Sequence, residues 1–126
     1  MANGKIKAFG NLIFEWLSQF ATTYNGALPD GVQPDNLYIL MSNYYENFAE
    51  QFIFPIQIYN RKTTSYLGVI NLSDKIEEKI GEGGLRVQSD SGLIIKIDKG
   101  SPFYQNKQDE DSTLRAGYIN LNITIY

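Results

Sequence analysis

The chain has 126 residues and a formal net charge of −3, and it contains neither histidine nor cysteine. This length suits one domain with its own hydrophobic core, so we expect a single domain over residues 1–126. The missing residue types exclude disulfides, zinc sites built from Cys or His, cysteine nucleophiles and catalysis by a histidine base. The acidic balance disfavours tight binding of DNA or RNA.

A helical period runs from Gly4 to Tyr24, where bulky apolar side chains recur at every third or fourth position. Asn3 is a suitable N-cap, and Asn25-Gly26 is a suitable stop because both residues tolerate positive φ. We expect an amphipathic helix that packs on a sheet. The alternative is an interfacial membrane helix, which is disfavoured because the polar face is not basic and nothing else in the chain is membrane-like.

Two strands are expected after a loop over residues 27–36. The first spans Leu37 to Ser42, and the second spans Phe52 to Asn60, where apolar residues alternate on one face. Pro55 has no N–H and therefore predicts an edge strand or a bulge for the second strand. An exposed edge can accept hydrogen bonds from a neighbouring chain, and it can equally be covered by solvent.

The chain then predicts a second helix and a hairpin. The helix extends from Ser65 to Ile80, with Ser73 as an alternative start because Gly68 weakens the first turns. A hairpin of Leu85 to Gln88 and Leu93 to Asp98 follows.

A long polar loop, Lys99 to Thr113, is expected before the last strand, and loops of this length are uncommon unless they have a function. The last strand, Tyr118 to Tyr126, alternates almost perfectly and is expected to be paired on both sides. The fold class is therefore α+β. We expect a mainly antiparallel sheet of about five strands with two helices packed on one face, in the order α-β-β-α-β-β-β.

Acidic and glycine-rich runs do not predict a catalytic, metal or cofactor site. Glu77 and Glu78 are adjacent on the expected helix and point in different directions, whereas a glycosidase needs two facing carboxylates. The run Asp109-Glu110-Asp111 lacks the spacing of a calcium loop and indicates a solvated loop. The glycines of residues 81–84 precede a strand rather than a helix, so they do not indicate a phosphate site. We expect a protein that is not an enzyme and binds no cofactor or metal.

Tyrosine is abundant, with nine residues, and its side chain suits protein–protein contacts. Alternation predicts one polar-aromatic sheet face from Tyr59, Tyr118, Asn120, Asn122 and Tyr126. Such a face can be an interface or an ordinary half-exposed surface.

Two stretches carry a family resemblance. In FPIQIYNRKTTSYLGVINLSDKIEEKIGE, residues Phe54 to Glu82, a strand ending in an aromatic residue leads through a Ser/Thr turn into an apolar helix that ends Lys-Ile-Gly. In LRAGYINLNITIY, residues Leu114 to Tyr126, an Arg introduces a terminal alternating strand after an acidic loop. Together with chain length and element order, these stretches make the chain resemble phage tail terminators, a family of minor capsid or tail-completion proteins.

The resemblance implies a non-enzymatic virion protein of the tail or neck, made in the host bacterial cytoplasm. Such proteins form a hexameric ring on the last ring of the tail tube, stop tube growth and provide the docking surface for the head. DNA passes through the lumen without specific binding. The implied partners are copies of the same chain, the tail tube protein and a head-completion or connector protein, with no membrane.

We accordingly expect an interface that includes Pro55, Gln57, Tyr59, Tyr104, Asp109, Glu110, Asp111 and Arg115. The acidic triplet is expected near the lumen or the tube contact, because an acidic lumen repels phosphates. Alternatives are a head–tail connector or stopper of the neck, a small ligand- or peptide-binding α+β module, and a hydrolase of the carboxylate type. The last of these requires two facing buried carboxylates, which no pattern in the sequence predicts.

Overall fold

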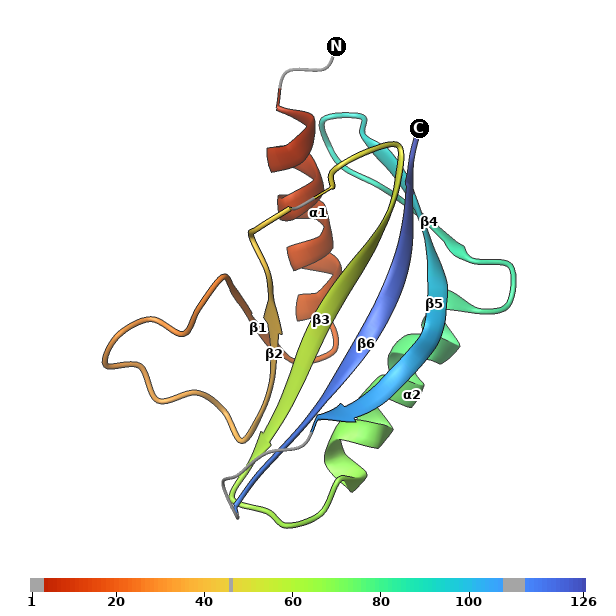
Figure 1. The fold of residues 1–126 in the computed structure, drawn as a ribbon. Helices are drawn as coiled ribbons and strands as arrows, with labels where there is room; N and C mark the ends of the chain where they lie inside the picture. Colours follow the sequence, from red (N-terminus) through yellow and green to blue (C-terminus); the bar gives the residue numbers. More distant parts are fainter. Residues whose placement is uncertain (1–3, 46, 108–112) are drawn as a thin grey trace.

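The computed structural model describes residues 4–45, 47–107 and 113–126. Two helices, α1 (Lys5–Ser18) and α2 (Leu67–Ile80), lie behind a curled six-stranded sheet in the view of Figure 1. The strands are β1 (Thr22–Asn25), β2 (Leu37–Met41), β3 (Gln51–Arg61), β4 (Leu85–Gln88), β5 (Ile94–Lys107) and β6 (Leu114–Ile125). The expected α+β class is confirmed, with two helices and six strands rather than about five.

The sheet has the strand order β1-β2-β3-β6-β5-β4. β1 and β2 are parallel, and the other four pairings are antiparallel. The sheet is therefore mixed, although most of its pairings are antiparallel. It contains one strand more than the expected order. β6 pairs with β3 on one side and with β5 on the other, so the prediction that the last strand is paired on both sides is confirmed.

The additional strand comes from the end of the predicted first helix. α1 ends at Ser18, and Thr22–Asn25 pairs with β2 instead of continuing the helix. Threonine and tyrosine favour extended backbone, and Thr23 is only 7% exposed opposite Ile39 in the parallel pair. The spacing of Phe20 and Tyr24 therefore fits a helix, but these residues lie beyond its end. The predicted N-cap, Asn3, lies outside the described residues.

The second helix takes the longer of the two predicted forms and begins at Leu67. The backbone N–H of Leu67 donates to the Ser65 Oγ at 3.1 Å, so the serine hydroxyl satisfies a donor of the first turn. Gly81, with φ of 72°, follows the last helical residue as predicted.

The predicted polar loop Lys99 to Thr113 is wrong over its first half, because β5 continues through Lys107. The ladder with β6 shifts register between Lys99 and Tyr104. Gly100 makes this shift possible, since a Cβ there would lie 2.7 Å from the backbone O of Asn120. Asp109, Glu110 and Asp111 lie outside the described residues.

The hydrophobic core lies between the helices and the sheet. Each helix turns its apolar stripe towards the strands, as the spacing of its residues predicts. The fully buried large side chains include Phe9, Ile13, Leu17, Ile39, Met41, Ile56, Ile58, Ile76, Ile80, Ile95, Ile97 and Ile119. Over the described part of the chain, neither helix has the length and apolarity that a membrane span requires.

Candidate interaction surface

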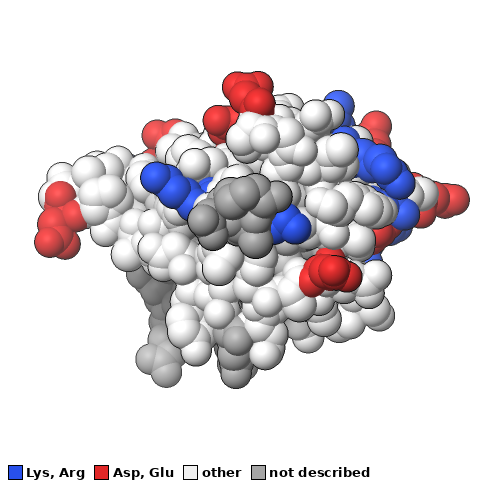
Figure 2. Space-filling view, turned by 90° about the horizontal axis from the view of Figure 1, so that it is seen from above, with Lys and Arg blue, Asp and Glu red and all other residues white. Residues whose placement is uncertain are grey.

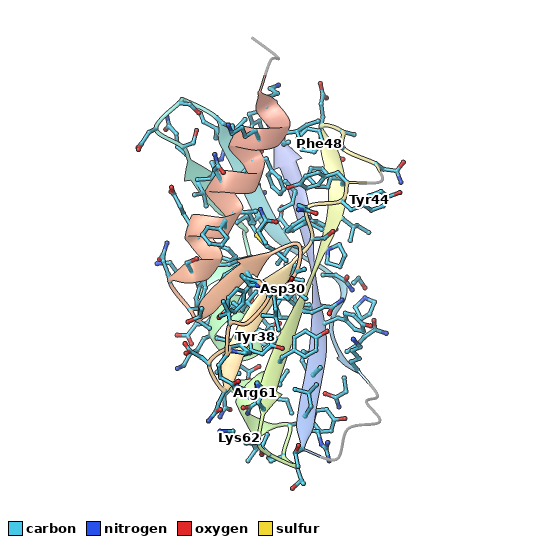
Figure 3. All side chains as sticks on the ribbon, turned by 90° about the vertical axis from the view of Figure 1, so that its left-hand side faces the viewer. Asp30, Tyr38, Tyr44, Phe48, Arg61 and Lys62 are labelled. Carbon is cyan, nitrogen blue, oxygen red and sulfur yellow. The ribbon has the colours of Figure 1, made fainter. Side chains whose placement is uncertain are left out.

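The sheet face opposite the helices carries the residues predicted to form a polar-aromatic surface. Phe54, Ile56 and Ile58 are buried on the helix side of β3, so the alternate residues of that strand lie on the other face. In the register with β6, Pro55 pairs with Asn120 and Gln57 with Tyr118. Tyr59, Tyr118, Asn120 and Asn122 thus share one face, which we call the outer face. The side view in Figure 3 places α1 on the other side of the sheet.

Tyrosine rings pack together at the end of the outer face that lies towards β1 and β2. The rings of Tyr38 and Tyr59 are stacked with centroids 5.2 Å apart, and Tyr24 meets Tyr38 edge-on at 5.8 Å. The Lys107 Nζ donates to the Tyr59 Oη at 3.1 Å and lies 5.9 Å from the Tyr118 ring centroid. Burial, and secondarily the neighbouring Tyr59, raises the pKa of Tyr38. These contacts bring tyrosine rings and one ammonium group together on the outer face.

Charged side chains on this face have partners within the chain. The Lys107 ammonium lies over the Tyr59 and Tyr118 rings. Figure 2, which looks at the molecule from above, shows acidic and basic side chains interspersed over that end. Lys96 and Asp98, which point to the outer face of β5, form an ion pair at 3.7 Å. The outer face therefore offers aromatic, amide and aliphatic groups rather than a charged field.

Among the described residues, none pairs with the first half of β3 on the side of β2. β2 pairs only with residues 56–60 of β3, so Gln51 to Pro55 extend beyond the end of β2. The N–H of Ile125 donates to the Glu50 carbonyl, and the N–H of Arg61 donates to the Asn36 carbonyl. The backbone N–H and C=O groups of successive residues point to alternate sides of a strand. Those of odd-numbered residues in β3 therefore point to the side of β2, and those of Gln51 and Ile53 lie beyond the end of β2. We call Gln51 to Pro55 the β3 border.

This border modifies the interpretation of Pro55. β3 is not an edge strand as a whole, since it lies between β2 and β6. Pro55 is nevertheless the last residue before the pairing with β2 begins at Ile56. Because proline has no N–H, Pro55 cannot extend the ladder on that side, which explains its place at the end of the β3 border.

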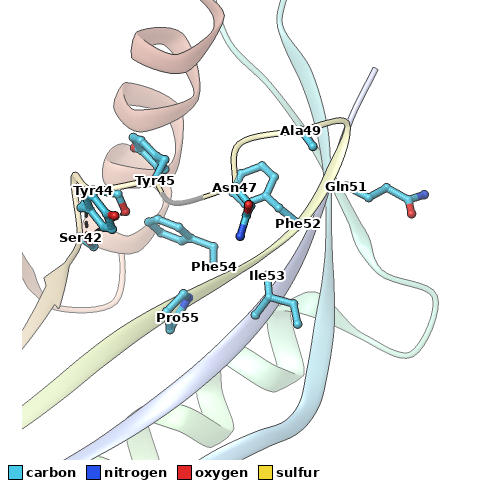
Figure 4. A pocket seen from close by; sticks show the side chains of 10 residues that line it. All are labelled: Ser42, Tyr44, Tyr45, Asn47, Ala49, Gln51, Phe52, Ile53, Phe54 and Pro55. Atoms are coloured by element: carbon cyan, nitrogen blue, oxygen red, sulfur yellow. Dashed lines mark hydrogen bonds between the residues drawn. The ribbon is translucent and has the colours of Figure 1, made fainter.

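A hollow of about 470 Å³ lies along the β3 border (Figure 4). Two of its lining side chains, Tyr44 and Ile53, are 74% and 63% exposed. The described lining residues are Ser42, Tyr44, Tyr45, Asn47, Ala49, Gln51, Phe52, Ile53, Phe54 and Pro55. The hollow thus combines aromatic and amide side chains with strand backbone, and no carboxylate is among these residues.

An aromatic cluster supports the hollow from the core side. The Phe9 ring of α1 meets Tyr45, Phe48, Phe52 and Phe54 edge-on, with centroids 5.2 to 5.9 Å away. The segment between β2 and β3 is held by this packing, and burial raises the pKa of Tyr45. The β3 border is therefore presented on a packed support.

The predicted interface residues divide into two places. Pro55, Gln57 and Tyr59 lie together on the outer face of β3. Tyr104 pairs with the buried Ile119 and faces α2, where burial and the nearby Tyr66 raise its pKa. The guanidinium of Arg115 lies 5.5 Å from the ring centroid of that same Tyr66.

Sequence reasoning missed Tyr38, Ile53 and Lys107 as members of this surface. Alternation alone places Ile53 beside Pro55 and Gln57 on one face, so this signal was available. Tyr38 and Lys107 join the surface only through pairing of distant strands. Among the described residues, no group of three or more Asp or Glu side chains is placed to hold a metal ion.

Comparison with known proteins supports the fold alone. No family model matches the sequence, and no curated protein matches it. One solved structure, whose name carries no functional information, is similar over 100% of this chain and 97% of its own, with a TM-score of 0.58 and 12% sequence identity. The whole chain therefore corresponds to a known arrangement of helices and strands.

Proposed function

We propose that this chain is a structural protein of a phage virion that caps the tail tube as a ring, ends tail elongation and provides the surface for head attachment. The proposal rests on the sequence resemblance to tail terminators and on one structural observation. That observation is the outer face together with the β3 border, which the described residues leave uncovered and where Lys96, Asp98 and Lys107 have partners within the chain.

This surface has the chemistry of a protein contact. Tyrosine and amide side chains combine contact area with hydrogen bonding, and strand backbone can pair with another chain. A nucleic-acid surface needs basic side chains in rows, whereas the Lys107 ammonium lies over tyrosine rings and Lys96 is paired with Asp98. In the proposed role DNA passes through the ring without specific binding, and the chain itself catalyses no reaction.

The decisive experiment measures the native mass of the full chain, alone and mixed with the tail tube protein of the same virion. We expect a discrete ring of six copies, which the tube protein stabilises or templates. A strict monomer in both conditions, with no binding to tube ends in electron micrographs, would overturn the proposal. A ring found between portal and tail completion proteins, rather than on the tube, would identify a connector or stopper instead.

A second candidate is a peptide-binding module, which the hollow along the β3 border favours. An extended peptide can add to such a border as a strand, with its side chains in the adjacent hollow. This candidate predicts a monomer that binds extended apolar peptides with one-to-one stoichiometry in calorimetry. Saturable binding of that kind by a chain that never forms rings would favour it over the terminator.

A further inference from the structure

A second unpaired strand segment, as far as the described residues show, lies on the other side of β6 from the β3 border. β4 pairs only with residues 94–97 of β5, although β5 continues to residue 107. The backbone N–H and C=O groups of odd-numbered residues in β6 point to β3, so those of even-numbered residues point to β5. Tyr118 is one of these, and the backbone groups of its β5 partner, Gln105, point back to β6. The backbone groups of Tyr104 and Asn106 therefore point away from β6, beyond the end of β4. We call residues 103–106 the β5 border.

The two borders have the relation that a head-to-tail assembly requires. β3 and β5 are both antiparallel to β6, so they run parallel to each other on its two sides. The β3 border lies at the start of its strand and the β5 border at the end of its own (Figure 1). A contact between two different surfaces repeats in one rotational sense, and it generates a ring when the rotation closes.

The offset between the borders has the size that ring closure needs. Ile53 pairs with Asn122 and Gln105 with Tyr118, so the border centres are four residues apart along β6. Four residues correspond to about 13 Å along the strands, and three strands span about 14 Å across the sheet. Successive copies joined at these borders would have strands inclined by roughly 42° to the ring axis, within the range of about 35–45° found in closed barrels.

We infer that the β5 border of one copy pairs in parallel with the β3 border of the next, with Gln105 beside Ile53. This inference rests on the proposed function and names its subunit contact. The partner is a second copy of the chain because both borders belong to the same sheet. They run in the same direction, have similar lengths, and are offset by four residues along β6. The pairing ends where β2 begins at Ile56. Six copies would contribute about 18 strands, a number at which barrels leave an open channel.

Engineered disulfides test this contact, because the chain has no cysteine of its own. In the Ile53→Cys/Gln105→Cys variant the two positions of one copy are separated by β6 across the sheet and by four residues along it, which puts them roughly 16 Å apart and beyond the reach of an internal disulfide. We expect oxidation of the assembled protein, with tube protein present where it templates the ring, to give a covalent ladder on denaturing gels that ends at the closed ring. Each single variant should give nothing larger than a dimer.

The matched control is Val32→Cys/Gln105→Cys, since Val32 is also exposed but lies in the loop between β1 and β2. A ladder in the control equal to that of the test pair, or no species beyond dimers in the test pair, would overturn the inference. Wild-type rings without a ladder would overturn this contact and leave the proposed function standing. A ladder from a chain whose wild type forms no ring would instead overturn the proposed function and support the contact.

Discussion

The two faces of β3 use aromatic residues in different ways. On the helix face, the fully buried Phe9 touches four other rings, of which Phe54 is buried and the other three are half-buried. On the outer face, Tyr38 and Tyr59 stack, and the Tyr59 hydroxyl donates to the Gln57 Oε1 and accepts from the Lys107 ammonium. Edge-on ring packing in the core gives stability, whereas tyrosine on a sheet face combines contact area with hydrogen bonding, which suits a protein contact.

The two faces also differ where the sheet is incomplete. On the helix face, the segment between β2 and β3 packs its Tyr45 and Phe48 rings against Phe54 and Phe52, while the described residues of that segment form no ladder with the first half of β3. The same half carries Ile53 on its outer face with 63% exposure. The helix side of this strand segment thus contributes to stability, and the outer side is exposed for contact with another chain. Substitutions on the helix side should therefore change the free energy of unfolding, and those on the outer side should change association.

The largest effect is expected for Phe9→Ala on the helix face. Removing a fully buried ring that contacts four others should lower the free energy of unfolding by about 3–5 kcal/mol. Urea or guanidinium denaturation measures the change, and Tyr44→Ala, at a 74% exposed site, is the control with an expected change within about 0.5 kcal/mol. Equal losses in the two variants would contradict the division between the faces.

A smaller loss is expected for Tyr59→Ala on the outer face. The substitution removes the stack with Tyr38 and the contacts of the Lys107 ammonium, which together should contribute about 2 kcal/mol. Tyr59→Phe keeps the ring and should lose only about 1 kcal/mol with the hydroxyl. If thermal and chemical unfolding show the same loss for both variants, the stacked ring is not the stabilising element.

High pH should act through the buried phenols. The pKa of Tyr38 in the folded chain lies above its usual value of 10.0, because burial disfavours the phenolate. The unfolded chain therefore loses this proton first, so the stabilisation is complete below pH 10 and is lost as the pH rises above it. Tyr38→Phe should weaken the decline of stability above pH 10 while Tyr44→Phe leaves it unchanged. Identical alkaline profiles for wild type and Tyr38→Phe would refute this assignment.

The smallest effect on stability, with a clear effect on association, is expected for Ile53→Thr. The side chain is mostly exposed and threonine favours strands, so the free energy of unfolding should change by no more than about 0.5 kcal/mol. Loss of the apolar contact at the β3 border should nevertheless shift the native mass towards smaller species. Sedimentation of wild type and variant at matched concentrations measures the shift, and unchanged sedimentation would remove Ile53 from the interface.

Local pattern predicted much of the fold correctly. The spacing of Phe9, Ile13 and Leu17 placed α1 against the sheet, and the alternation of Ile119, Leu121 and Ile123 placed β6 between two partners. These signals are strong because a whole face of each element is buried. The end of α1 was less certain, since residues 20–24 fit a helical period and also contain strand-forming threonines.

The candidate surface was predictable only in part. Pro55, Gln57 and Tyr59 share a face through simple alternation, and the structure places them so. Tyr104 was expected with them but faces α2, because the register shift at Gly100 changes which residues of β5 point outwards. A shift of this kind depends on contact with Asn120, far along the chain, and no local pattern records it.

By itself, the sequence determined the identity of most elements and the burial of their apolar faces, because helix and strand periods are properties of neighbouring residues. Only the tertiary structure decided the strand order, the parallel pairing of β1 with β2 and the two borders, on either side of β6, that the described residues leave unpaired. These features depend on how far each strand extends beyond its partner. That length is set by packing between segments that are distant in the chain, and the proposed contact between copies follows from it.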